Sequence, residues 1–190
     1  MTRGKIFILS GPSGSGKTTI HEHILSSKAL KNKLVRSISM TTRPRRENEK
    51  QGREYFFVSR KMFEYKIRAG HFLEWAKVFT NYYGTPAKKV NDVVAKGKSV
   101  LLCIDVQGAA QIKACYPEAI SIFIMPPSQK ELESRLRKRS TEDKKALGIR
   151  LSEAKQEMAK AKDYNHVVIN KDLPTACNQV KEIILKNVNK

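Results

Sequence analysis

The sequence predicts an α/β protein built on a parallel β-sheet that helices cover on both faces. Short apolar segments alternate with amphipathic segments along the 190 residues, which is the pattern of consecutive βαβ units. The apolar runs at 99–105 and 119–125 are nearly uninterrupted, as expected for strands buried on both faces. A glycine-rich loop directly after the first apolar run adds the third observation.

That loop holds the most specific motif of the chain. Residues 6–9 form an apolar strand, and an amphipathic helix that includes Ile20 follows. Between them, residues 11–18 match G-x-x-x-x-G-K-[ST], the phosphate-binding loop. Glycines let successive backbone N–H groups converge on one anion, Lys17 can reach the outer phosphates, and the Thr18 hydroxyl can ligate Mg²⁺. The stretch predicts nucleotide binding.

The other elements follow from hydrophobic spacing, capping residues and turn composition. We expect strands at 34–40, 54–58, 71–76, 99–105, 119–125 and 166–170. Helices are expected at 59–70, 88–96, from 106 onward, at 128–139, at 151–161 and through 188. Ser59 and Ser128 are the expected caps of two of these helices. Residues 41–52 are expected to form a loop, 81–86 a turn, and 140–147 a polar, mobile connection.

Composition limits the class of protein. No apolar run approaches the ~18–20 residues of a membrane helix, and the N-terminal run is too short for a signal peptide. Three widely spaced cysteines suit a reducing cytosol, so a cytoplasmic protein is expected. The formal charge of +19 is consistent with anionic ligands, but the lysines are dispersed, which favours a solvated basic surface over a nucleic-acid site.

Seven stretches, in matching order and spacing, resemble the guanylate kinase family over nearly the whole chain. They are residues 10–17 (SGPSGSGK), 39–43 (SMTTR), 52–58 (GREYFFV), 72–76 (FLEWA), 81–84 (NYYG), 104–108 (IDVQG) and 126–128 (PPS). Guanylate kinases transfer the γ-phosphoryl group of ATP to GMP or dGMP. The resemblance therefore implies ATP and Mg²⁺ as cofactors, and GMP or dGMP as the small-molecule partner rather than a membrane or nucleic acid.

The resemblance also implies a P-loop nucleoside monophosphate kinase fold within a single domain, 1–190. Its core would comprise about 1–37, 96–127 and 161–190. A GMP-binding lobe would occupy about 38–95, and an arginine-bearing helical lid about 128–160.

Residue roles follow from the same match. The GMP phosphate would be held by Ser39, Arg43, Arg46, Tyr55 and Tyr83, since guanidinium groups grip phosphate with two prongs. Glu74 would accept hydrogen bonds from the guanine N1–H and amino group, with Thr85 assisting. Adenine lacks those two donors, so Glu74 would reject it. Taken alone, Glu74 could equally be a strand acid facing solvent.

ATP would be bound by the loop and by two lid arginines: Gly11, Pro12, Ser13, Gly14, Ser15, Gly16, Lys17, Thr18, Arg135 and Arg139. Charge that develops during transfer would be stabilised by Lys17, Arg43, Arg139 and Arg150. Asp105 ends an apolar strand and has two readings: an acid near the metal or the acceptor nucleotide, or a helix-capping aspartate.

Several positions depart from the family pattern. Arg45 replaces a usual proline and could compete with Arg46 for the phosphate, and Asn48 replaces a glycine. Cys103 stands where relatives commonly carry an acid. Residues 138–140 (KRS) replace Gly-Arg-Gly, and Lys171 follows Asn170 where an acid is more typical.

Two other functions compete with guanylate kinase activity. One is a related kinase with another acceptor, such as a ribose bisphosphate, which Glu74, Tyr83 and Thr85 argue against. The other is a non-catalytic binding module of this family, which the intact phosphate loop argues against. The sequence indicates neither an oligomeric state nor a preference between GMP and dGMP.

Overall fold

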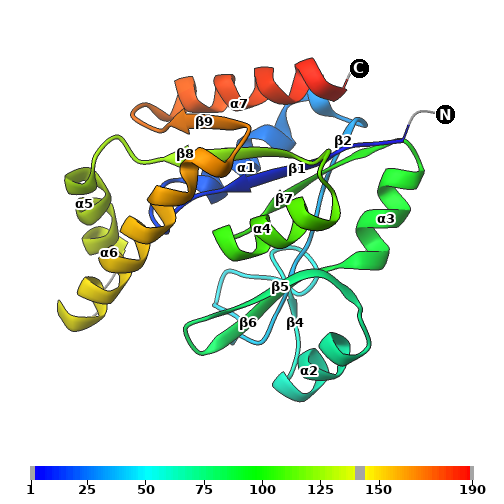
Figure 1. Cartoon of the computed structure of the whole chain (residues 1–190), viewed down its shortest axis with the longest axis horizontal. Helices are drawn as coiled ribbons and strands as arrows, with labels where there is room; N and C mark the ends of the chain where they lie inside the picture. Colours follow the sequence, from blue (N-terminus) through cyan, green and yellow to red (C-terminus); the bar gives the residue numbers. More distant parts are fainter. Residues whose placement is uncertain (1–2, 140–143, 189–190) are drawn as a thin grey trace.

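The chain folds into two separate β-sheets. The structure, a computed structural model, describes residues 3–139 and 144–188, and the side chains of 138–139 and 144–146 lie outside this description. The first sheet has five parallel strands in the order β2-β7-β1-β8-β9, and the second has four in the order β4-β3-β6-β5 (Figure 1).

The five-stranded sheet confirms the predicted parallel core. Its strands are β2 (Leu34–Arg36), β7 (Ser99–Cys103), β1 (Ile6–Ser10), β8 (Ile120–Met125) and β9 (His166–Ile169). Alternate residues of β1 face opposite layers, as strand geometry requires. Phe7 and Leu9 pack into one apolar cluster, and Ile6 and Ile8 into the other. Apolar residues on both faces explain why the sequence pattern of β1, β7 and β8 is continuous rather than alternating.

Helices cover both faces of this sheet. On one face lie α1 (Lys17–Ser26) and α7 (Leu173–Val188), which pack together, with the short turn η1 (Lys28–Leu30) after α1. On the other lie α3 (Ala87–Ala95) and α4 (Val106–Cys115) (Figure 1). The second layer is thus supplied partly by a helix that leads out of the second sheet, which links the two halves of the molecule.

The four-stranded sheet is mixed. It contains β4 (Phe56–Phe57), β3 (Met40–Thr41), β6 (Asn81–Pro86) and β5 (Phe72–Val78), and α2 (Arg60–Arg68) packs beside β5. Ser59 caps α2 by accepting a hydrogen bond from the Met62 N–H, as predicted. The Gln111 side chain of α4 pairs with both backbone groups of Trp75, so the five-stranded core holds β5 directly.

Two expectations for this region were wrong. Residues 34–40 do not form one strand: Ser37 still bonds to Leu101 in the core, while Ser39 bonds to Phe56 in the second sheet. The chain crosses between sheets at this point. Residues 81–86 form strand β6 rather than a turn. Gly84 is needed there because a Cβ would come within 3.0 Å of the Phe63 and Phe72 rings.

A helical pair projects from the carboxyl edge of the core. It consists of α5 (Gln129–Arg139) and α6 (Lys144–Ala159), followed by η2 (Lys160–Asp163). Ser128 caps α5 as predicted. Helix α6 begins seven residues before the expected start at 151, and 140–143 of the expected mobile connection lie outside the described residues. Leu132 and Leu136 of α5 pack against Leu147 and Ala154 of α6.

Within the described residues, none of the helices combines the length and the apolar character needed to cross a membrane.

Candidate nucleotide-binding site

The phosphate loop has a backbone that only glycine accommodates at two points. Gly11 has φ +140°, and a Cβ there would lie 2.3 Å from the Ile124 carbonyl oxygen of β8. Gly16 has φ +94°, and its Cβ would meet the Asn170 amide nitrogen at 2.3 Å. That Asn170 amide donates to the Ser15 carbonyl at 2.8 Å. The end of β9 therefore fixes the loop, and the glycines make this close approach possible.

The loop leads into a helix N-terminus suited to an anion. Gly16 precedes α1 in the left-handed conformation and offers no side-chain cap. The first turn of α1 presents Lys17, Thr18 and Thr19, so the N–H groups and the positive dipole end favour a bound anion. The Lys17 ammonium folds back and donates to the Gly11 and Pro12 carbonyls, the latter at 2.8 Å. It can turn from these carbonyls to a phosphate oxygen by side-chain rotation.

Two of the predicted arginines lie on the helical pair α5–α6, and one of them contacts the loop itself. Arg150 donates to the Ser13 hydroxyl at 3.1 Å. Arg135 donates to the Asn170 carbonyl at 3.2 Å and to Glu131 at 2.9 Å. The third predicted lid arginine, Arg139, has its side chain outside the described residues. The structure thus brings Arg135 and Arg150, from two different helices, to the mouth of the loop.

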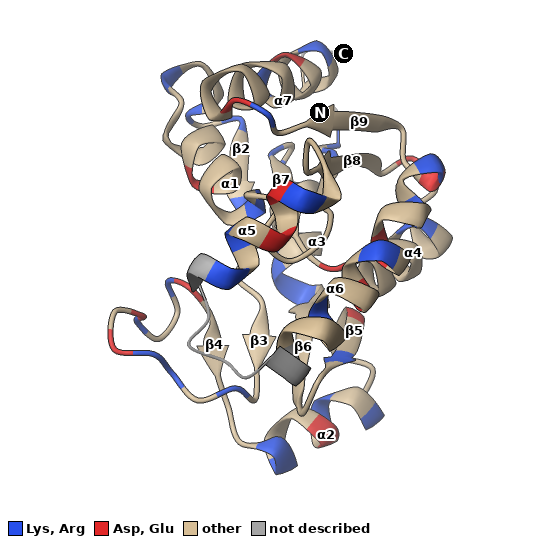
Figure 2. Cartoon of the chain, turned by 90° about the vertical axis from the view of Figure 1, so that its left-hand side faces the viewer, with Lys and Arg blue, Asp and Glu red and all other residues tan. Residues whose placement is uncertain are grey.

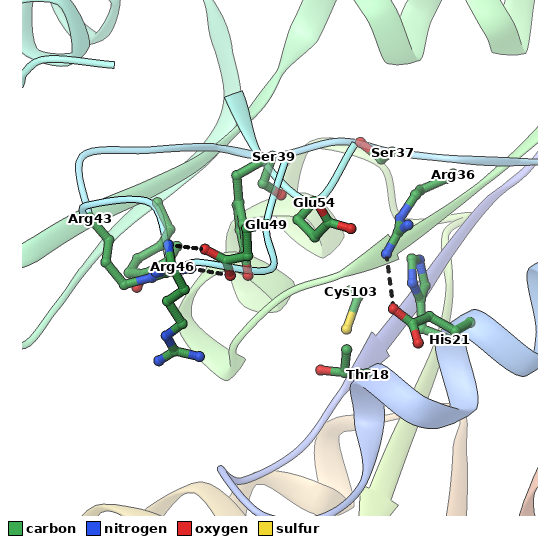
Figure 3. A pocket seen from close by; sticks show the side chains of 13 residues that line it. Thr18, His21, Arg36, Ser37, Ser39, Arg43, Arg46, Glu49, Glu54 and Cys103 are labelled. Atoms are coloured by element: carbon green, nitrogen blue, oxygen red, sulfur yellow. Dashed lines mark hydrogen bonds and ion pairs between the residues drawn. The ribbon is translucent and has the colours of Figure 1, made fainter. Parts of the chain in front are cut away.

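A cavity of about 250 Å³ lies between α1 and the second sheet (Figure 3). Thr18 and Cys103 contribute to it from the core, and Ser39, Glu49 and Arg46 from the loops that carry the second sheet. All five residues predicted to hold a phosphate line it together: Ser39, Arg43, Arg46, Tyr55 and Tyr83. The departure at Arg45 leaves this arrangement intact, because Arg45 donates to the Glu49 carbonyl instead.

An ion pair organises the arginines of this cavity. Arg43 donates to Glu49 at 2.6 Å, and each of the two side chains is only 14% exposed. The second Glu49 oxygen accepts the Arg46 backbone N–H at 2.9 Å. Burial disfavours both charges, yet the paired guanidinium keeps the pKa of Glu49 below its ordinary value. The guanidinium also lies 5.6 Å from the centre of the Tyr55 ring, so it is held on two sides.

A second cavity, of about 290 Å³, opens toward the phosphate loop. It contains Gly11, Ser13, Lys17 and Thr18 of the loop, together with Glu74, Asp105 and Glu157. The two cavities share five lining residues: Thr18, Ser39, Tyr55, Tyr83 and Cys103. A ligand in one cavity therefore lies next to a ligand in the other.

Glu74 is the acid at the far end of the second cavity. It is 4% exposed, and the Thr85 hydroxyl donates to its Oε1 at 2.6 Å. The pKa of Glu74 is raised to about 7, mainly by burial; the Thr85 hydrogen bond opposes this shift, and the nearby Asp105 charge adds to it. A Cβ on Gly108 would collide with Glu74 Oε2 at 2.4 Å. The carboxylate is therefore a fixed, partly paired acceptor facing the cavity rather than a solvent-exposed strand acid.

Asp105 shows one of its two predicted roles directly. Its Oδ1 accepts the N–H groups of Gln107 and Gly108 at 2.8 and 2.9 Å, which caps α4. The residue also lines the second cavity, so the cap positions a carboxylate beside the phosphate loop. The two readings of the sequence are compatible in the structure.

The metal ligand set is incomplete without a nucleotide. In residues 3–139 and 144–188, groups of three or more His, Cys, Asp or Glu that could hold a metal ion are absent. Thr18 nevertheless faces both cavities. The residues fit a Mg²⁺ ion that arrives with nucleotide phosphates, since Mg²⁺ usually takes few protein ligands and several phosphate or water oxygens.

Three residues of the site were not singled out from the sequence as site residues. Asn170 fixes the loop, Glu49 fixes the arginines, and Glu157 enters the second cavity from α6. Glu157 lies seven residues, or two helical turns, after Arg150, and that spacing could have indicated a shared face. Glu49 is an acid inside a basic stretch, which was the available signal for an ion pair.

Lysines and arginines are spread along the ribbon of both halves of the molecule (Figure 2). The cations that line the two cavities are Lys17, Arg36, Arg43 and Arg46. These few cations lie at the phosphate loop and in the adjoining cavity. Such an arrangement is suited to binding the phosphates of two small molecules side by side. The fold and the site together define the class of P-loop kinases that act on nucleoside monophosphates.

Comparison with known proteins identifies the family within this class. The sequence model of the guanylate kinase family matches residues 3–187. The guanylate kinase of Clostridium tetani is 45% identical over 184 residues, which cover 97% of this chain and 86% of that protein. The guanylate kinase of Carboxydothermus hydrogenoformans is 43% identical, with coverage of 97% and 89%.

A solved structure agrees. The crystal structure of guanylate kinase from Anaplasma phagocytophilum superimposes with a TM-score of 0.79 at 34% identity, covering 100% of this chain and 89% of that one. The chain belongs to the guanylate kinase family. It is a transferase that phosphorylates GMP with ATP as the donor.

Proposed function

We propose that the two adjoining cavities together hold both substrates of this reaction. GMP extends from the first cavity, which takes its phosphate, to Glu74 in the second, and the ATP phosphates bind at the loop side of the second cavity. GMP, or dGMP, occupies the lobe formed by about 38–95, and the ATP phosphates occupy the loop 11–18. The helical pair within about 128–160 serves as the lid. The observation that carries the proposal is the common wall of the two cavities, which contains Thr18, Ser39, Tyr55, Tyr83 and Cys103.

On the acceptor side, the phosphate of GMP binds among Arg43, Arg46, Ser39, Tyr55 and Tyr83. Arg43 donates through Nη2 to Glu49 at 2.6 Å and through Nη1 to the Pro44 carbonyl at 2.8 Å. The guanidinium has five N–H donors, so the remaining ones can face a phosphate. Because the pair is assembled before the ligand arrives, little side-chain entropy is lost on binding.

The base is read by Glu74. Its carboxylate accepts hydrogen bonds from guanine N1–H and the amino group, and Thr85 holds it in place. Adenine presents an acceptor at N1 and lacks the 2-amino group, so the buried carboxylate would face a lone pair. The site therefore discriminates by the penalty of an unpaired buried group.

On the donor side, the loop N–H groups and Lys17 bind the phosphates, with Arg135 and Arg139 over the nucleotide. Mg²⁺, when bound through Thr18, neutralises phosphate charge. Lys17, Arg43, Arg139 and Arg150 stabilise the charge that moves as the GMP phosphate oxygen attacks the γ-phosphorus in line. Asp105 lies where it can orient the acceptor side of this assembly.

The lid keeps water from competing with GMP as the acceptor. Arg150 already contacts the loop at Ser13, and Arg135 contacts Asn170, the residue that follows β9. The lid can therefore close over ATP by adjusting contacts that already exist. We further propose that the protein acts in the cytoplasm, where both nucleotides are available; its free thiols Cys103, Cys115 and Cys177 suit a reducing compartment.

The test is ADP formation from ATP and Mg²⁺ with GMP, dGMP, AMP or ribose 1,5-bisphosphate offered separately. Turnover is expected with GMP and dGMP, and a rate with AMP at least about 10³-fold lower, in the range reached by sites that recognise substrate hydrogen-bond groups. Comparable turnover on AMP or on the sugar phosphate would show that Glu74 does not select the base.

A further inference from the structure

Helix α6 turns one stripe of side chains toward the phosphate loop. Arg150, Ala154 and Glu157 lie at i, i+4 and i+7 and therefore share a face. Ala154 is fully buried against the leucines of α5, which fixes the rotation of the helix. Arg150 donates to the Ser13 hydroxyl, and Glu157 lines the second cavity with Ser13 and Lys17. The stripe thus presents a carboxylate to the loop as well as a guanidinium.

The carboxylate lies where a phosphate would bind. Burial raises the pKa of Glu157 to about 7, whereas the Lys17 charge and the Ser13 backbone N–H pull it down, and Asp105 and Glu153 add to the upward shift. The Ser13 N–H and the Lys17 ammonium are the loop donors assigned above to ATP. In the free protein they face a carboxylate of the lid.

Charge makes shared occupancy unfavourable. A triphosphate brings several negative charges to a loop beside which Glu157 and Asp105 already lie. Like charges a few ångström apart in a partly buried site repel strongly. Either the carboxylate leaves or the affinity for the phosphates falls.

We propose that Glu157 is a resident anion of the donor site, which accepts the Ser13 N–H and lies near the Lys17 charge in the free enzyme and is displaced by the phosphates of ATP. This inference rests on the donor site proposed above. Displacement separates Glu157 from the loop while Arg150 remains, so nucleotide entry changes how α6 contacts Ser13. The contact keeps the empty loop ordered and lowers the affinity for ATP.

The test compares wild type with Glu157→Gln, which removes the charge and keeps the shape. Binding of ATP and of inorganic tripolyphosphate is measured by calorimetry at pH 8 with EDTA present. The Kd of both ligands is expected to fall about three- to tenfold in Glu157→Gln, while the Kd of GMP stays unchanged. Glu157→Asp keeps the charge and should bind ATP more weakly than Glu157→Gln does. Glu182→Gln, which removes an exposed acid on α7, should match wild type.

Three results would overturn the proposal. An unchanged or weaker affinity of Glu157→Gln for tripolyphosphate, with wild-type binding intact, would show that Glu157 does not compete with phosphates. A loss of ATP affinity in Glu157→Gln that occurs only with Mg²⁺ would make it a partner of the metal's water shell instead. If wild type itself fails to bind tripolyphosphate, the proposed donor site is wrong, and so is the inference about Glu157 that rests on it.

Discussion

Lys17→Met is expected to lower kcat/KM for GMP phosphorylation by about 10³-fold or more, within the range found when a charged group that stabilises a phosphoryl-transfer transition state is lost. Methionine has a similar length and no charge, so the loop should keep its shape. That shape depends on Gly11, Gly16 and the Asn170 bond to Ser15. The lost interaction is the one that strengthens as charge moves onto the leaving ADP.

The measurement is steady-state ADP formation with both substrates varied. GMP binding, measured by calorimetry, should survive in Lys17→Met, because the phosphate cavity is lined by Arg43 and Arg46. The matched control is Lys88→Met: Lys88 is 87% exposed and pairs only with Asp92 in the described part of the chain. A Lys17→Met enzyme with near wild-type kcat would show that the loop lysine is not part of phosphoryl transfer.

Glu74→Gln is expected to lower kcat/KM for GMP by about 10²- to 10³-fold, because an amide presents N–H donors where guanine also presents donors. The surroundings amplify the effect. Glu74 is enclosed by Thr85 and Gly108, so the new amide cannot turn away into solvent. The loss should appear mainly in KM for GMP, and KM for ATP should change little.

The pH dependence separates the charge of Glu74 from its shape. Burial raises its pKa to about 7 in the free protein, and only the ionised form accepts both guanine donors. The affinity for GMP should therefore increase as pH rises from 6 to 8. Thr85→Val removes the hydrogen bond that lowers this pKa, so the midpoint should move to higher pH. Identical calorimetric profiles for wild type and Thr85→Val would contradict the assignment.

The features of the fold and site that the sequence predicted are those encoded locally. The phosphate loop is a contiguous motif between a strand and a helix, and the caps at Ser59 and Ser128 need only neighbouring residues. The central core strands β1, β7 and β8 were predicted because burial on both faces leaves a continuous apolar run. In these stretches, the local composition and the tertiary environment favour the same secondary structure.

The parts that were wrong or missed depend on distant contacts. Asn81 and Gly84 have turn-like composition, but pairing with β5 and packing on Phe63 and Phe72 make the segment a strand. Residues 34–40 look like one strand in the sequence, although the two ends of this segment hydrogen-bond to different sheets. Glu157 is an ordinary helix acid until the fold brings α6 to the loop. Its role depends on tertiary placement, which no local pattern encodes.

The most direct test of the central claim is the affinity of a single molecule that reaches both cavities: adenosine and guanosine joined through five phosphates. If the loop and the lobe hold ATP and GMP side by side, this ligand should bind one per protein, at least about 10²-fold tighter than either nucleotide alone, because the second contact becomes intramolecular. Lys17→Met and Glu74→Gln should each weaken it. A Kd no lower than that of ATP, and unaffected by Glu74→Gln, would contradict the adjoining donor and acceptor sites.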